Sequence, residues 1–133
     1  YWRSKLMFGL LGSSENVKDI LRGFNADPEL GIIVANGEIY EGDKGWRSNR
    51  RRCEELAGKI GLNLADFPAR FACGSIFWSR GSALKPLREL SLSAATFEVE
   101  DGAVDGTTAH AIERLFSIFA MAEGFSVVER SEI

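Results

Sequence analysis

Residues 105–116 of this 133-residue chain constrain its fold more than any other segment. Apolar residues recur here at the three- and four-residue spacing of one helix face, and the stripe runs one turn further: Ala109, Ile112, Leu115, Phe116 and Phe119. Such a stripe has to pack against other parts of the chain. The segment therefore predicts a helix over residues 107–122 that lies against a core and ends before Gly124.

The polar residues of the same segment form the first candidate functional site. His110 lies one turn from Glu113 and Arg114, so these three side chains can meet on one surface. Asp105 lies at the expected helix start, where free backbone N–H groups and the positive end of the helix dipole attract anions. This arrangement suits chemistry on a phosphorylated or hydroxylated ligand. A helix N-cap is the alternative role for Asp105.

Short apolar runs separated by capping residues and glycines predict further helices and strands. Helices are expected over residues 2–11, 14–26, 48–61 and 82–90, and strands over residues 30–35, 70–80 and 125–129. Residues 36–47 are polar and rich in glycine, which predicts a loop. The alternation is typical of an α/β or α+β layer structure, and the length suits a single domain over residues 1–133.

The charge balance and the residue types exclude several classes of protein. Sixteen basic and 19 acidic residues give a net charge of −3, which does not suit a generally basic nucleic-acid binder. A single histidine excludes a multi-histidine zinc site, and no metal site is predicted. Cys53 and Cys73 are far apart and have apolar neighbours, so buried free thiols are expected. The longest apolar runs are too short to cross a bilayer.

Acidic residues gather just before the last expected helix. Four carboxylates fall within eight positions: Glu98, Glu100, Asp101 and Asp105. Mutual repulsion is expected to raise their pKa values and so to favour a base near neutrality. Asp105 is the preferred base because it adjoins the helix that carries His110. Glu100 is a candidate substrate contact, and a solvated acidic loop is the other interpretation of the residues before Asp105.

Basic and aromatic residues supply further candidate ligand contacts. Arginines at position 47 and positions 50–52 form the one basic patch, which suits a diphosphate, an anionic membrane surface or simply a solvated helix start. Trp78 or its neighbour Phe77 can stack on a sugar ring, although alternation along a strand turns only one of them towards each layer. Arg80 at the strand end suits either an anion or the capping of a helix.

Three blocks of sequence, in the expected order, cover nearly the whole chain. The first is Leu30-Gly31-Ile32-Ile33 with Gly45-Trp46 and Asn49; the second is ACGSIFWSR at residues 72–80 with Ala83-Leu84 and Pro86-Leu87; the third is Asp105-Gly106-Thr107 with AHAIERLF at residues 109–116 and Gly124-Phe125. They resemble the rhamnan synthesis protein F family, bacterial glycosyltransferase-like proteins that build rhamnose-containing polysaccharides and lipopolysaccharide chains. The chain departs from the expected pattern at Cys73, Ile76, Ala103 and Thr108.

The resemblance implies a sugar transferase with two halves. The N-terminal half would bind a nucleotide-activated donor, such as dTDP-rhamnose, and a divalent metal through an acidic motif, and the C-terminal half would shape the acceptor site. This chain has no convincing DxD motif and begins without a methionine, so it is similar to the C-terminal half of a GT-A-type glycosyltransferase. A fragment of this kind is expected to hold no cofactor and to be inactive without the N-terminal half.

The resemblance also implies partners and a location. The expected partner molecule is a glycan or lipid-linked glycan acceptor, and no nucleic acid is expected. The implied location is the cytoplasm at the inner face of the cytoplasmic membrane, with peripheral membrane association.

Sugar transfer needs a base that removes the acceptor hydroxyl proton. Asp105 and His110 are the expected catalytic residues. The expected substrate contacts are Trp78, Arg80, Glu100, Glu113 and Arg114. The alternative is a non-catalytic carbohydrate-binding or assembly module. A transferase half should bring Asp105, His110 and the Trp78 strand to one open cleft.

Overall fold

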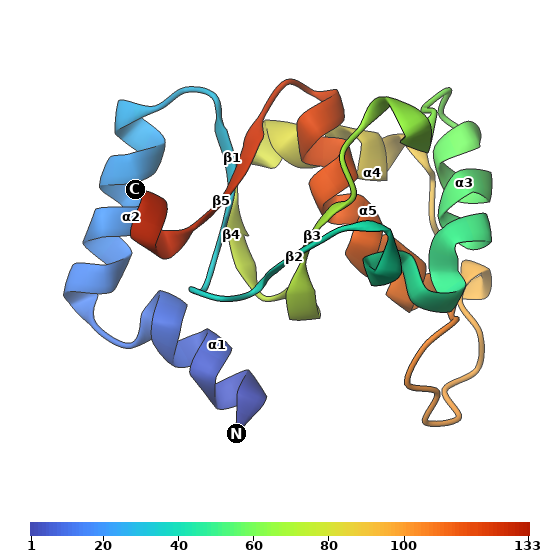
Figure 1. Ribbon diagram of the computed structural model, residues 1–133, viewed down its shortest axis with the longest axis horizontal. Coiled ribbons are helices and arrows are strands. Elements are labelled where there is room, and N and C mark those ends of the chain that lie inside the picture. Colours follow the sequence, from blue (N-terminus) through green and yellow to red (C-terminus); the bar gives the residue numbers. More distant parts are fainter.

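The computed structural model describes residues 1–133 and has a mixed α+β fold, as the alternation of elements predicted (Figure 1). The helices are α1 (Trp2–Leu11), α2 (Ser14–Ala26), α3 (Arg50–Gly58), α4 (Lys85–Glu89) and α5 (Thr108–Ala122). The strands are β1 (Leu30–Val34), β2 (Ile39–Glu41), β3 (Arg70–Ala72), β4 (Phe77–Ser79) and β5 (Ser126–Glu129). A 3-10 segment, η1 (Asp43–Asn49), leads into α3. No helix combines the length and apolar character needed to cross a membrane.

The central sheet has three strands in the order β4-β1-β5. β1 runs antiparallel to β4 and parallel to β5, and all five of its residues are buried. Its side chains alternate between the faces of the sheet, as strand geometry requires. Ile33 packs towards α1 and α2, whereas Ile32 and Val34 pack with Ala120 of α5. The sheet therefore lies between two helical layers, which Figure 1 shows on either side of the strands.

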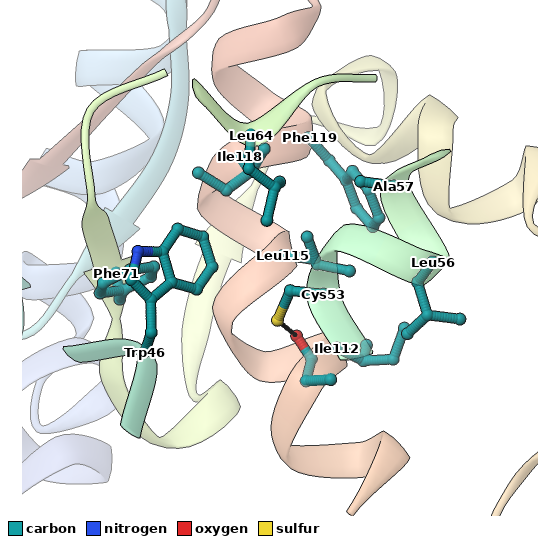
Figure 2. Close-up of a cluster of buried hydrophobic side chains, with 11 residues drawn as sticks. Trp46, Cys53, Leu56, Ala57, Leu64, Phe71, Ile112, Leu115, Ile118 and Phe119 are labelled. Carbon is teal, nitrogen blue, oxygen red and sulfur yellow. Dashed lines mark hydrogen bonds between the residues drawn. The ribbon is translucent and has the colours of Figure 1, made fainter. Parts of the chain in front are cut away.

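The largest core cluster surrounds α5 and has 11 buried residues. Figure 2 shows Leu115 and Phe119 of α5 facing α3, and Trp46 beside Phe71 of β3. Cys53 of α3 is buried in this cluster, and its thiol donates to the carbonyl of Ala111 at 3.5 Å. The predicted stripe on α5 is confirmed from Ile112 onward, but Ala109 is exposed because the first turn lies at the protein surface.

Two segments differ from the sequence prediction. Residues 36–47, predicted as a loop, contain β2 and most of η1; β2 pairs with β3 in a separate two-stranded sheet. Residues 70–80 form not one β-rich unit but β3 and β4, which belong to different sheets. The break falls at Gly74, whose φ of +80° suits glycine and over which the Trp2 ring packs too closely for a Cβ atom, at 2.5 Å.

Candidate functional site

A cavity of about 120 Å³ opens between η1, the β2–β3 sheet and α5. Its lining residues are Tyr40, Lys44, Gly45, Arg47, Phe71, Cys73, Glu113 and Arg114. Tyr40 and Phe71 lie opposite each other on the paired strands, and Glu113 and Arg114 come from the second turn of α5. Segments far apart in the sequence therefore meet at this pocket.

The wall formed by η1 depends on close packing. Trp46 is buried and meets the Phe71 ring edge-on, with 4.5 Å between ring centroids. Gly45 lies so close to Phe71 and Tyr40 that a Cβ atom would come within 2.6 Å of both rings. Only glycine lets the backbone approach the aromatic pair in this way. Lys44 and Arg47, the neighbours of this Gly45-Trp46 pair in the sequence, also line the cavity.

Arg114 fixes this wall to α5. Its side chain is 10% exposed, and its Nε donates to the carbonyl of Gly45 at 3.3 Å. Nη1 donates to the carbonyl of His110 and to the Glu113 carboxylate, at 3.2 and 2.9 Å, and Nη2 lies 3.9 Å from Asp105. Glu113 and Arg114 are adjacent in sequence, and they pair because the long arginine side chain folds back to its neighbour. A buried cation is thus neutralised by two carboxylates.

Asp105 holds two segments of the chain together. Its two oxygens accept hydrogen bonds from the backbone and hydroxyl of Ser48 and from the Asn49 side chain, and Asn49 in turn accepts from the Gly106 N–H. Burial by itself raises the pKa of Asp105, but the hydrogen bonds from Ser48 and Asn49 outweigh burial and hold that pKa below its usual range. Asp105 is not the N-cap of α5; the side chain of Thr107 is, and it accepts from the backbone of His110.

Two of the four acidic residues, Glu98 and Asp105, have lowered pKa values instead of the raised values that mutual repulsion predicted. The backbone N–H of Thr108 donates to Glu98 at 2.9 Å and, with the Thr108 hydroxyl and Arg52, lowers the pKa of Glu98 to about 2. The expectation is therefore wrong for Glu98 and for Asp105, because hydrogen bonds to the charged form dominate both environments. A carboxylate that is strongly hydrogen-bonded in this way is a poor base at neutral pH.

The predicted basic patch separates into paired and unpaired arginines. Arg50 forms ion pairs with Glu54 and Asp43, and Arg51 pairs with Glu55 one turn along α3. Arg52 pairs with Glu98. Arg47 forms no ion pair or hydrogen bond with the protein, and it is the member of the patch that lines the cavity.

The other predicted site residues do not join the pocket. Trp78 packs against the cluster of Leu6 and Leu10 beneath α1. Arg80 donates to the carbonyls of Leu30, Phe24 and Asp27, so it caps the end of α2 and the start of β1. The capping alternative thus describes the contacts of Arg80.

Glu100 and His110 also stand apart from the cavity. Glu100 is exposed and accepts only a local hydrogen bond from the Gly102 N–H. His110 is half-buried, and its Nδ1 lies 2.6 Å from the Thr107 hydroxyl. Of the residues predicted from sequence, Arg47, Glu113 and Arg114 line the pocket, and Asp105 lies outside the lining, 3.9 Å from Arg114. No group of three or more His, Cys, Asp or Glu side chains is arranged to hold a metal ion.

Five of the eight lining residues are not among the contacts predicted from sequence: Tyr40, Lys44, Gly45, Phe71 and Cys73. Tyr40, Lys44, Gly45 and Arg47 come from the glycine-rich segment for which the sequence predicts a loop. Its polar, glycine-rich character between two structured segments is the signal that points to a functional loop. Cys73 is half-buried rather than buried, and burial raises the pKa of its thiol.

Comparisons with known proteins identify the family. The chain matches the model of rhamnan synthesis protein F over residues 1–125. Two relatives from Xanthomonas campestris pv. campestris, of strains B100 and ATCC 33913, are each described as uncharacterized protein WxcX. Each is 34% identical over 126 residues, which cover 95% of this chain and 18% of the relative. No solved structure gives a significant match. The chain belongs to the rhamnan synthesis protein F family, and this membership connects it with polysaccharide synthesis.

Proposed function

We propose that this chain is the acceptor-side portion of a glycosyltransferase that transfers rhamnose from a nucleotide sugar in bacterial cell-surface polysaccharide or lipopolysaccharide synthesis. The observation that carries the proposal is the composition of the cavity between η1 and α5. An exposed aromatic ring (Tyr40), two unpaired cations (Lys44 and Arg47) and the Glu113 carboxylate face one opening. Sugar hydroxyls and ring faces are bound by this combination of polar and aromatic groups.

The size of the cavity supports the acceptor side rather than the donor side. Sites for whole small-molecule ligands typically measure about 300–1,000 Å³. The cavity here, at about 120 Å³, has room for one small group, with the rest of the ligand lying across the open mouth. The nucleotide sugar, for example dTDP-rhamnose, and any divalent metal would then bind in the remainder of a longer protein. Its acceptor would be a free or lipid-linked glycan at the inner face of the cytoplasmic membrane.

Among the carboxylates, Glu113 is the best placed to act on an acceptor hydroxyl. It lines the cavity, and its one protein partner is the Arg114 guanidinium. Asp105 has donors on both oxygens and a lowered pKa, so it would position η1 and α5. The catalytic roles of Asp105 and His110 remain predictions, and the transfer assay below tests that of Asp105.

The proposal is tested on the complete protein with labelled dTDP-rhamnose and a glycan acceptor. Tyr40→Ala should raise the KM for the acceptor by about tenfold, the effect of losing roughly 1.4 kcal/mol of binding. Phe97→Ala is a matched control, because Phe97 is about as exposed as Tyr40, at 39% against 43%, and lies outside the cavity. If Tyr40→Ala and Phe97→Ala leave transfer equally unaffected, the cavity is not the acceptor site.

A second set of variants separates catalysis from binding. Glu113→Gln should lower kcat by roughly a hundredfold or more if Glu113 is the base. A loss of that size in Asp105→Asn, with the fold intact, would return the role to Asp105. The alternative function, a non-catalytic carbohydrate-binding or assembly module, is favoured by two observations: Asp105, His110 and Trp78 do not meet in one cleft, and Asp105 is fully hydrogen-bonded. Undiminished transfer in all carboxylate variants, combined with acceptor binding that depends on Tyr40, would support that alternative.

A further inference from the structure

The lining of the cavity is positively charged in a protein whose net charge is −3. It contains three cations and one carboxylate. The charge of Arg114 is balanced by Glu113 and Asp105, at 2.9 and 3.9 Å. Lys44 and Arg47 therefore supply the uncompensated charge, since neither side chain forms an ion pair or a hydrogen bond with the protein.

The neighbouring arginines show that pairing is the usual state of cations in this region. Arg50 and Arg51 each reach a carboxylate one turn along α3, at 3.0 Å, and Arg52 reaches Glu98. Asp43, the carboxylate next to Lys44 in sequence, faces Arg50 rather than the cavity. Lys44 and Arg47 differ from these residues in that both line a concave surface. Two donors without partners at one opening form a site for an external anion.

The backbone at Arg47 is strained. Its φ and ψ are 49° and −131°, a conformation that L residues rarely adopt and that glycine adopts readily. Glycine at this position would relieve the strain, yet the chain has arginine there. Strained residues that carry a functional side chain are a feature of ligand sites.

We propose that Lys44 and Arg47 bind an anionic substituent of the acceptor glycan, a phosphate or a carboxylate. The inference rests on the proposed function and names the chemistry of its ligand. A single phosphate or carboxylate group fits a cavity of about 120 Å³, and the sugar that carries it would lie against Tyr40, which also lines the cavity. The guanidinium of Arg47 offers paired donors that match two oxygens of either anion, and Lys44 adds a point charge.

The test is an NMR titration of the isotope-labelled chain with three probes at one ionic strength. Rhamnose 1-phosphate and glucuronate carry the two anions, and methyl rhamnoside is neutral. Arg47→Gln and Lys44→Gln should each weaken binding of at least one anionic probe by about tenfold, as expected for the loss of a hydrogen bond to a charged group. Arg51→Gln, which removes an exposed arginine outside the cavity, should leave binding unchanged.

The outcomes distinguish this inference from the proposed function. The anionic probe that binds in a manner dependent on Arg47 identifies the substituent as phosphate or carboxylate. Equal weakening by Arg51→Gln, or none by the two pocket variants, would overturn the inference, because the anion would then be responding to overall charge. Methyl rhamnoside binding at Tyr40 without anion binding would overturn the inference alone. No binding of any probe at the pocket would overturn both proposals.

Arg47→Gly provides an independent readout that a merely structural arginine would not give. It removes the anion contact and the strain together, so the melting temperature should rise by about 2–5 °C while anion binding is lost. Arg47→Gln keeps the strained backbone, so it should lose binding without that rise. A fall in the melting temperature of Arg47→Gly would show that the arginine serves the fold, and would contradict the assignment.

Discussion

Helices α1 and α5 are both rich in apolar residues, but the fold covers them differently. On α5, nine of 15 residues are buried, on faces that meet α3, α4 and the strands. On α1, Leu6 and Leu10 are fully buried, whereas Phe8 is 73% exposed. Apolar residues lie on both faces of α1, and the protein covers only the face towards β1. The comparison shows that apolar content predicts a packed helix only where neighbouring elements supply a layer on each side.

The polar contacts of the two helices differ in the same way. Arg114 and Asp105 connect α5 with η1 through a network in which both charges have partners. The first turns of α1 are attached through Glu38, which accepts from Trp2 and Lys5, each at 2.9 Å. The candidate site is therefore built at the α5 side, where the surrounding core holds its residues rigidly.

The largest expected effect comes from truncating the core around α5. Phe119→Ala should destabilise the protein by about 3–5 kcal/mol. The Phe119 side chain is fully buried, and its removal leaves a cavity that the surrounding elements cannot fill. Chemical denaturation measures the free energy of unfolding. A cost below about 1 kcal/mol would show that α5 is not enclosed as tightly as its burial indicates.

Leu6→Ala should cost less, about 2 kcal/mol, although Leu6 is as fully buried as Leu115. Helix α1 packs on one layer and can detach locally, and local detachment limits the cost of the substitution. Hydrogen exchange should therefore speed up in α1 and remain slow in α5. Equal destabilisation by Leu6→Ala and Leu115→Ala, with exchange accelerated in both helices, would remove the distinction between them.

The sequence predicted the helices and the central strand better than it predicted the site. The α5 stripe from Ile112 to Phe119 is long and periodic, so its core-facing side is readable from local pattern. The partners of Asp105 lie 56 and 57 residues away, and no local pattern encodes that distance. For the same reason, the position of Arg80 at a strand end is compatible with two roles, and only its long-range carbonyl partners distinguish them.

Acid should weaken the contacts that Glu98 and Asp105 make with α5. The pKa values of Asp105 and Glu98 are both lowered in the folded protein, so their contribution to stability is present above the ordinary values of 3.8 and 4.5 and is lost as pH falls below them. For Glu98 the loss should extend to about pH 2. The melting temperature of the wild-type protein should fall from pH 5 to pH 2. Glu98→Gln should lower it at pH 7 and flatten this pH dependence, and an unchanged slope would contradict the hydrogen-bonded geometry.

The smallest expected effect is on the uncovered face of α1. Phe8→Ser should change the free energy of unfolding by less than about 0.5 kcal/mol, because an exposed side chain loses few contacts when it is replaced. The exposed apolar residues of this helix, Trp2, Met7, Phe8 and Leu11, instead favour association between molecules. Phe8→Ser should therefore reduce any concentration-dependent association in sedimentation velocity, while Phe119→Ala, which leaves this surface intact, should not. Destabilisation by Phe8→Ser comparable to that of Leu6→Ala would mean that the outer face of α1 is covered in solution, and the contrast between the two helices would then disappear.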